Sequence, residues 1–326
     1  MIMLSYPNVL DNTIMTIVKT LGRGTAHVVH GLSYFMYTLF LFNKADIKTT
    51  VIPISLLGAA SAPIHDTPGA PHVVLWVFLN LLQFCVSNQT IDGSEDALIK
   101  TWRPIPAKRI SHAQAIALRW LLIPGVALYS MAYSKQTMYA SLLFSVFTIM
   151  HNELEGHRYW YMKNLTNGLG FAALGFGAVL IAESADQGLY DAGANHEQPD
   201  RVAALSIIFS SCIFATTTHG QDFKDEAGDR AIGRRTIPIV FGAMAKYTLF
   251  VPMLLWSAGL CRMWTVDTTT SVGFLALALY AGSHYLSARS VKEFQVAYVW
   301  YNVWLSCAYA MPAYYRLANH GASIMS

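Results

Sequence analysis

Charge is what this sequence has least of. Only 13% of its 326 residues are charged, whereas soluble domains carry about 25%. The hydrophobic share is 54%, and the mean hydropathy is +0.37. The net charge is only +3, so no strong field would draw in nucleic acid. These values argue against soluble domains and favour a protein that crosses the membrane several times.

Cysteine is scarce as well, and no targeting segment stands out. Cys85, Cys212, Cys261 and Cys307 occur singly in apolar stretches, without the close pairs of a zinc site or a disulfide framework. The first residues lack the layout of a signal peptide, and Asp11 with few nearby arginines fits a mitochondrial transit peptide poorly. We therefore expect the spans themselves to direct the chain to the endoplasmic reticulum or another endomembrane rather than to the mitochondrion.

Long apolar stretches, in contrast, are abundant. A helix needs about 17–25 residues to cross the hydrocarbon, and the candidate spans are 49–64, 71–90, 112–133, 137–153, 163–184, 202–220, 237–261, 270–288 and 298–317. The aromatic-rich stretch 26–42 is expected to lie in the membrane interface as an amphipathic helix. The predicted fold is an all-α, polytopic bundle of nine transmembrane helices around a central cavity capped on the cytosolic side. It occupies residues 44–317, between an N-terminal region (1–43) and a C-terminal tail (318–326).

The basic residues are distributed unevenly about these spans. Of the 22 lysines and arginines, Lys135, Arg201, Arg262 and Arg316 lie on one side, while Arg119 and Lys246 fall inside spans. All the others lie on the opposite side, together with the N-terminus and the unusual polar stretches. Because lysine and arginine favour the cytoplasmic side, we expect that side to be cytosolic and the C-terminus to lie across the membrane.

Two acidic stretches interrupt the apolar pattern at span ends. In "NQTIDGSEDALIKTWRP", Asn88, Asp92 and Asp96 recur every fourth residue, so a continuing helix would place them on one face. After the sixth span, "HGQDFKDEAGDRAIGRRTIP" supplies Asp222, Asp225 or Glu226, and Asp229. An acid inside a bundle costs about 2.5 kcal/mol or more unless it is paired or bound to metal. Oxygen ligands without a His or Cys pair suit Mg²⁺, which is the cofactor we expect.

Basic residues follow each acidic stretch. Lys100 and Arg103 follow the first, and Arg234 and Arg235 follow the second. Such cations can bind diphosphate oxygens that a metal leaves free. Together they would provide the electrostatic stabilisation that ionisation of an allylic diphosphate requires. The alternative is a pair of solvated loops whose acids are balanced by neighbouring bases.

The pattern of these motifs resembles the UbiA superfamily of intramembrane prenyltransferases. Asn88-x-x-x-Asp92-x-x-x-Asp96 is similar to its first aspartate-rich motif, and "KTWRPIP" to the segment that follows. "DFKDEAGDRAIGRRTIP" is similar to the second motif, and Tyr159-x-x-x-Lys163 to the family's Tyr/Lys element. The resemblance covers residues 44–317, and the motif variants are nearest to a fungal branch that includes terpene cyclases.

The resemblance implies a role for each matched residue. Mg²⁺ and diphosphate would be held by Asn88, Asp92, Asp96, Asp222, Asp225 and Asp229. The diphosphate would also contact Lys100, Arg103, Tyr159 and Lys163. The substrate would be an isoprenyl diphosphate, either geranylgeranyl or farnesyl diphosphate, bound within membrane lipid. The oligomeric state stays open.

Aromatic residues gather in the ninth span. Tyr301 and Trp304 share a stripe there, and Trp304 lies near mid-depth, where it is a candidate wall of a pocket that shields a carbocation. Tyr298, Tyr314 and Tyr315 lie nearer the span ends, where an interfacial aromatic belt explains them equally well.

The acceptor of the carbocation separates the candidate activities. The family's aromatic-acid enzymes carry an arginine-containing element at the first span, but this chain reads "FNKADIKTTVIPISLLG" there. We therefore predict intramolecular cyclisation, with prenyl transfer to an aromatic acceptor as the alternative. A transporter is a third interpretation, since paired half-repeats occur in transporters. It is disfavoured because the lysines and arginines would repel a transported cation.

Overall fold

The computed structural model describes residues 28–63, 69–91, 100–184 and 199–324, with side chains up to residue 318. These residues form helices and connecting turns. The only strand-like pairing among them is a single parallel bridge between Tyr159 and Arg235. The all-α prediction is therefore confirmed for the part of the chain that the structure describes.

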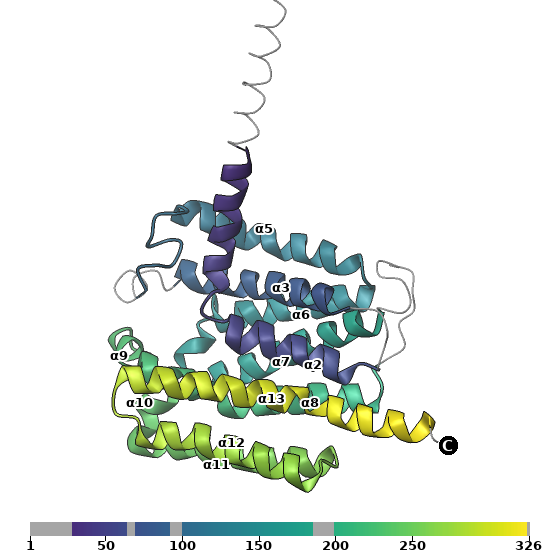
Figure 1. The fold of residues 1–326 in the computed structure, drawn as a ribbon. Coiled ribbons are helices and arrows are strands. Elements are labelled where there is room, and N and C mark those ends of the chain that lie inside the picture. The colour runs from purple at the N-terminus through teal and green to yellow at the C-terminus, as the bar shows by residue number, and fades with distance from the viewer. Residues whose placement is uncertain (1–27, 64–68, 92–99, 185–198, 325–326) are drawn as a thin grey trace, which may run out of the picture.

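The helices follow one another with short connections, and most run side by side (Figure 1). A helix over residues 28–43 precedes them. The main elements are η1 (Ile47–Val51), α2 (Ile52–Ser61), α3 (Ala70–Ile91), α5 (His112–Met131), α6 (Lys135–His151), α7 (Trp160–Glu183), α8 (Arg201–Thr217), α9 (Asp222–Ala231), α10 (Ile237–Phe241), α11 (Ala245–Met263), α12 (Thr268–Ser287) and α13 (Val291–Ile324). The short 3₁₀ helices are η2 (Gly156–Arg158), η4 (Thr218–Gln221) and η5 (Gly242–Met244).

Five helical runs in the described residues are long and apolar enough to cross a membrane. They are Ala70–Ile91, His112–Met131, Trp160–Glu183, Arg201–Ala231 and Ile237–Met263. The other predicted ranges also fall on helices: α2 with η1, α6, α12 and α13. The η1–α2 run, Ile47–Ser61, is apolar but short. The predicted count of nine spans therefore stays a prediction.

Side chains that cap helix starts fix several boundaries. The Ser111 hydroxyl accepts a hydrogen bond from the backbone N–H of Gln114, whose side chain accepts one from the Ser111 N–H, so a capping box begins α5. Ser134 caps α6, Asp200 caps α8 and Asp267 caps α12 in the simpler manner. The turns between apolar helices are therefore defined by single polar residues that the sequence displays.

Helix α7 lies at the centre and packs against α2, α3, α6 and α8. Glycines allow this close approach. A Cβ on Gly168 would lie 2.7 Å from the Ala215 Cβ of α8, and a Cβ on Gly177 would overlap the Trp76 ring of α3. Trp76 is fully buried and donates a hydrogen bond from Nε1 to Ser130 Oγ (2.8 Å), so its ring is fixed in place. The central helix is thus held by contacts that a side chain would prevent.

The helix over residues 28–43 lies across the bundle instead of along it (Figure 1). Its exposed side chains include Val28, Leu32 and Phe35. It is attached through Arg109, whose guanidinium lies 4.0 Å from the Tyr34 ring centroid and donates a hydrogen bond to Thr38 Oγ1 (3.1 Å). The predicted interfacial helix (26–42) falls on this element, apart from its first two residues, which lie outside the described residues. Its apolar exposure suits a position in the membrane interface.

The polar helix α9 and the short apolar helix α10 lie at one end of the bundle, and the C-terminus lies at the other (Figure 1). Two loops are joined at the α9 end. The Arg235 N–H donates to the Arg158 carbonyl (2.7 Å), and the Trp160 N–H donates to the Arg235 carbonyl (3.0 Å). The start of α7 is thereby held beside the segment that follows α9, and this contact positions the site.

Candidate active site

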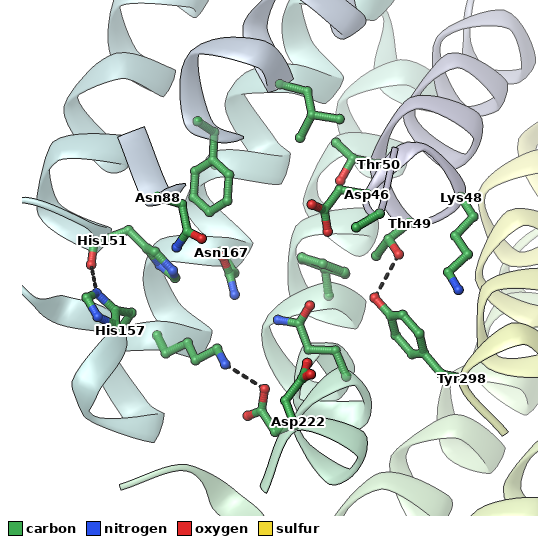
Figure 2. Close-up of a pocket in the computed structure, with 18 of the residues that line it drawn as sticks. Asp46, Lys48, Thr49, Thr50, Asn88, His151, His157, Asn167, Asp222 and Tyr298 are labelled. Atoms are coloured by element: carbon green, nitrogen blue, oxygen red, sulfur yellow. Dashed lines mark hydrogen bonds and ion pairs between the residues drawn. The ribbon is translucent and has the colours of Figure 1, made fainter. Parts of the chain in front are cut away.

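A cavity of about 630 Å³ reaches into the bundle beside α9 (Figure 2). Its size lies within the range of small-molecule pockets, about 300–1,000 Å³. Its lining changes character along α7, from Lys163 at the helix start through Asn167 to Phe171 and Leu174. The cavity therefore has a charged end near α9 and an apolar, aromatic interior.

An ion pair joins α7 to α9 at the charged end. Lys163 Nζ lies 2.5 Å from Asp222 Oδ1, and both side chains are buried (Figure 2). The other oxygen of this carboxylate, Asp222 Oδ2, is buried and accepts no hydrogen bond within the described residues. A buried carboxylate oxygen without a donor is unfavourable, so this oxygen is a candidate ligand for a cation.

Two further aspartates of α9 line the cavity. Asp229 is buried, its Oδ1 lies 2.7 Å from Arg234 Nη1, and its Oδ2 likewise has no hydrogen-bond donor among the described residues. Asp225 lies 2.5 Å from Lys224 Nζ and 3.8 Å from Lys100 Nζ. The spacing along α9 thus places three carboxylates at one end of the cavity, each with a cationic partner.

Carboxylate oxygens of this kind are the ligands that Mg²⁺ prefers. The two buried Oδ2 atoms of Asp222 and Asp229 therefore fit such an ion. No group of three or more His, Cys, Asp or Glu residues in the described part of the chain could hold a metal ion alone. Asp92 and Asp96, predicted as further ligands, lie outside the described residues.

The residues that flank this undescribed segment also line the cavity. Asn88, on the last turns of α3, faces it from the side opposite Asp222 (Figure 2). Lys100 and Arg103 line it as well, and Arg103 is buried. Most of the predicted diphosphate-binding residues are thus brought together: Asn88, Lys100, Arg103, Lys163, Asp222, Asp225, Asp229 and Arg234.

The structure places two predicted contacts elsewhere. Tyr159 is 45% exposed at the start of α7, and Arg235 is exposed opposite it in the backbone bridge. Neither residue is part of the cavity lining. The bridge between them instead holds the start of α7, which carries Lys163, beside the segment that carries Arg234.

The aromatic wall also differs from the prediction. Trp304 is fully buried and donates a hydrogen bond to Ser257 Oγ (2.9 Å), and Tyr301 is hydrogen-bonded to Thr217 Oγ1 (2.9 Å). Neither lines the cavity. Tyr298, one turn before Tyr301, does line it, and its hydroxyl bonds to Thr49 Oγ1 (2.7 Å; Figure 2). The remaining aromatic lining consists of Phe84, Trp102, Phe144, Phe147, Phe171 and Phe214.

Other cavity residues had no signal in the sequence. The π-helical turn η1 brings Lys48 and Thr50 into the lining, and Asp46, directly before it, lines the cavity as well. This is the element where the family's arginine is absent. π-helical turns often occur at functional sites, but they leave no sequence pattern. His157 lines the cavity too, and its Nδ1 lies 2.8 Å from the His151 carbonyl oxygen. Only the folded chain brings these residues to the cavity.

Helices long and apolar enough to span a membrane, with buried carboxylates and cations at one end of a cavity, are typical of a helical membrane protein with a polar site. Comparison with known proteins narrows this class. Residues 49–308 match the UbiA prenyltransferase family, and the chain belongs to that family. A UbiA homolog from Archaeoglobus fulgidus, solved with GPP and Mg²⁺, has a TM-score of 0.56 at 14% identity, covering 85% of this chain and 99% of that one. It shares the fold.

Curated relatives share more of the sequence. The chain is 32% identical to the fumagillin beta-trans-bergamotene synthase of Aspergillus fumigatus over 289 residues, 87% of this chain and 94% of that protein. It is 28% identical to a diterpene cyclase of Hericium erinaceus (71% and 74% covered). It is 26% identical to a polyprenyl transferase of the same species (68% and 73% covered). These relatives are enzymes, and the transporter interpretation gains no support.

Proposed function

We propose that the protein ionises an isoprenyl diphosphate in the presence of Mg²⁺ and then cyclises the prenyl chain in the same cavity. The observation that carries the proposal is the division of one cavity into a charged end and an aromatic interior. Along α7, Lys163 and Phe171 lie two turns apart and both line it. An isoprenyl diphosphate has the matching division, with an anionic head and an apolar chain.

The acidic residues would hold the metal. Asp222, Asp225 and Asp229 are the proposed ligands on α9, and Asn88 with Asp92 and Asp96 would complete the set from the α3 side. Bound there, Mg²⁺ would neutralise charge on the departing diphosphate. The support within the described residues is the pair of buried Oδ2 atoms that lack a hydrogen-bond donor.

The basic residues would bind the head group itself. Lys100, Arg103, Lys163 and Arg234 can donate N–H hydrogen bonds to diphosphate oxygens, and charge-assisted bonds of this kind are the strong ones. When the allylic C–O bond breaks, its electron pair leaves with the diphosphate. Donors already in place then stabilise the developing negative charge without reorganisation. Tyr159 and Arg235 would contribute through the bridge that holds the start of α7, which carries Lys163, beside the segment that carries Arg234.

The aromatic interior would govern the carbocation. Phe171 and Phe214 have ring centroids 3.4 Å apart with nearly parallel planes, and together with Tyr298 they line the cavity. Aromatic faces stabilise cations and exclude water. A double bond of the same chain, folded to within about 3–3.5 Å of the cation, would form the new C–C bond. Loss of a proton from a neighbouring carbon would then give a cyclic hydrocarbon.

Two relatives favour cyclisation, because their names identify a bergamotene synthase and a diterpene cyclase. The substrate would be farnesyl or geranylgeranyl diphosphate. The alternative is transfer of the prenyl group to an aromatic acceptor, which the similarity to a polyprenyl transferase supports. The absence of the arginine element at η1, where Asp46 and Lys48 line the cavity instead, favours cyclisation.

The membrane arrangement is part of the proposal. Nine spans, with α2, α6, α12 and α13 added to the five apolar runs, would place the charged end of the cavity on the cytosolic side of an endomembrane such as the endoplasmic reticulum. Protease treatment of sealed vesicles should remove an N-terminal tag and spare a C-terminal one. Loss of the C-terminal tag alone would show that the orientation is the opposite of the proposed one.

The activity is tested with purified protein and defined substrates. Incubation with Mg²⁺ and the C10, C15 or C20 diphosphate, followed by mass spectrometry of an organic extract, should yield a cyclic hydrocarbon and free diphosphate. Chelation of the metal should stop both. A prenylated aromatic product that forms only when an aromatic acceptor is added would refute cyclisation and establish the transferase.

A further inference from the structure

Arg119 is a charge within the apolar helix α5 that the diphosphate site does not use. Its side chain is only 2% exposed. Charged residues inside membrane helices are costly and usually have a function. Its Nε donates a hydrogen bond to Glu153 Oε1 (2.9 Å), and its Nη2 lies 2.8 Å from the same oxygen. The pair joins α5 to the end of α6, away from the cavity lining.

A chain of hydrogen bonds runs from this pair to the cavity. The Ser87 hydroxyl donates to Glu153 Oε1 (2.9 Å), so the Ser87 oxygen is left to accept. Asn152 Nδ2 donates to that oxygen (3.0 Å). Asn88 Nδ2 in turn donates to Asn152 Oδ1 (3.3 Å), and Asn88 lines the cavity.

The direction of every bond in this chain follows from its first member. A guanidinium can only donate and an ionised carboxylate can only accept. The Ser87 hydroxyl must therefore donate its hydrogen bond to Glu153. The Ser87 oxygen then takes the NH₂ group of Asn152, which turns the Asn152 carbonyl oxygen toward Asn88. Asn88 must therefore direct its NH₂ group at Asn152. Its carbonyl oxygen is left on the side that faces the cavity (Figure 2).

We propose that this chain of hydrogen bonds orients Asn88 so that its amide oxygen, and not its NH₂ group, is offered to the metal ion. Arg119, Glu153, Ser87 and Asn152 are positioning residues, since they act through Asn88. The inference rests on the proposed function, which supplies the cation. An amide rotated by half a turn would present a donor to that cation and repel it.

The test measures affinity for Mg²⁺ with inorganic diphosphate by calorimetry on detergent-purified protein. Ser87→Ala removes the hydroxyl that sets the direction, and loss of a partner that orients a ligand typically weakens metal binding by about 10- to 100-fold. Ser145→Ala is the matched control. Ser145 is also a buried serine between α3 and α6, but it bonds to Gln83 and has no link to Asn88. It should bind as the unsubstituted protein does.

A double substitution separates orientation from packing. Asn88→Asp carries oxygens on both sides of its side chain, so Ser87→Ala should cause no further loss of affinity in that background. The inference would be overturned if Ser87→Ala lowered the affinity equally with Asn88 and with Asn88→Asp. It would also be overturned if Ser145→Ala lowered the affinity as much as Ser87→Ala does. If Ser87→Ala elutes as aggregate, Asn152→Leu provides the same comparison, because it removes the carbonyl oxygen that accepts from Asn88. Failure of the unsubstituted protein to bind would overturn the proposed function as well, whereas binding that neither Ser87→Ala nor Asn152→Leu weakens would overturn the orienting role alone.

Discussion

Lys163 on α7 and Asp222 on α9 form an ion pair of 2.5 Å, with 8% and 2% of their side chains exposed. Loss of either partner would leave the other charge buried without compensation, which is strongly unfavourable. The pair therefore fixes α9 against the central helix and holds one carboxylate oxygen at the cavity. Fold and site depend on the same contact.

Asp222→Asn should abolish most of the activity. The substitution keeps the shape of the side chain and removes the charge that would bind the metal, so diphosphate release should fall by at least about 100-fold. Release is measured with a coupled phosphate assay. The control is Glu226→Gln on the same helix, since Glu226 pairs with the exposed Arg230 and is not part of the cavity lining. If the Asp222→Asn variant retained a large part of the turnover, the metal would have to bind elsewhere.

Tyr298→Ala should change the product, whereas Trp304→Ala should change the stability of the fold. Tyr298 lines the cavity, so its removal should change the product mixture toward linear or earlier-terminated species at a similar rate of diphosphate release. Trp304 is fully buried, does not line the cavity and stacks on Phe274. Its removal should therefore lower the free energy of unfolding by about 3–5 kcal/mol, the usual cost for a buried aromatic residue. Gas chromatography and thermal unfolding distinguish the two. A product change from Trp304→Ala in folded protein would restore Trp304 as a wall residue.

Gly177→Ala should destabilise the fold, since the new methyl group would overlap the fixed ring of Trp76. Overpacking of this kind costs about 1–3 kcal/mol. The midpoint of thermal unfolding in detergent measures it. Gly259→Ala on α11 is the control, because a Cβ there meets nothing within 4 Å and should be tolerated or slightly stabilising. Equal midpoints for both variants would show that α3 and α7 can separate.

The stability of the protein should depend on pH through Asp200, at the end of the bundle remote from α9. Burial raises the pKa of this carboxyl, but hydrogen bonds from Arg316 and the Ala203 amide lower it by more. The folded-state pKa therefore lies below the ordinary 3.8. The resulting stability is present above the unfolded-state pKa and is lost as pH falls through the folded-state one. Asp200→Asn should therefore lower the unfolding midpoint at neutral pH. The corresponding loss in the free energy of unfolding is at most about 1 kcal/mol, because the ion pair is partly exposed.

The difference in unfolding midpoint between the Asp200→Asn variant and the unsubstituted protein should become smaller at pH values below the ordinary pKa of the carboxyl. Thermal unfolding at a series of pH values measures it. A difference that stays constant into the acid range would show that the ionised carboxylate and its ion pair with Arg316 are not the source of the effect.

The helices and most charged site residues could be predicted, because they leave regular patterns. Apolar runs predict the helices, and polar residues at a spacing of three or four predict that Asn88 and Asp222 lie at span ends, where the structure brings them to one cavity. Asp46 and Lys48 could not be predicted, since a π-helical turn and the residue before it leave no sequence pattern that shows which way they point. Trp304 was assigned to the cavity wall from its depth alone. The rotation of α13 about its axis, which turns Tyr298 and not Trp304 toward the cavity, is set by packing against neighbouring helices.

The cavity wall formed by α7 has one further consequence, for how such an enzyme could acquire a different product. Asn167, Phe171 and Leu174 form a stripe on one face of a helix that other faces hold in close contact with α2, α3 and α8. The backbone beneath the stripe cannot move away when a side chain on it changes size. Each substitution there would change the space for the proposed prenyl chain by nearly its own volume. The residues of this stripe are therefore where small changes in sequence would produce large changes in the shape of the product.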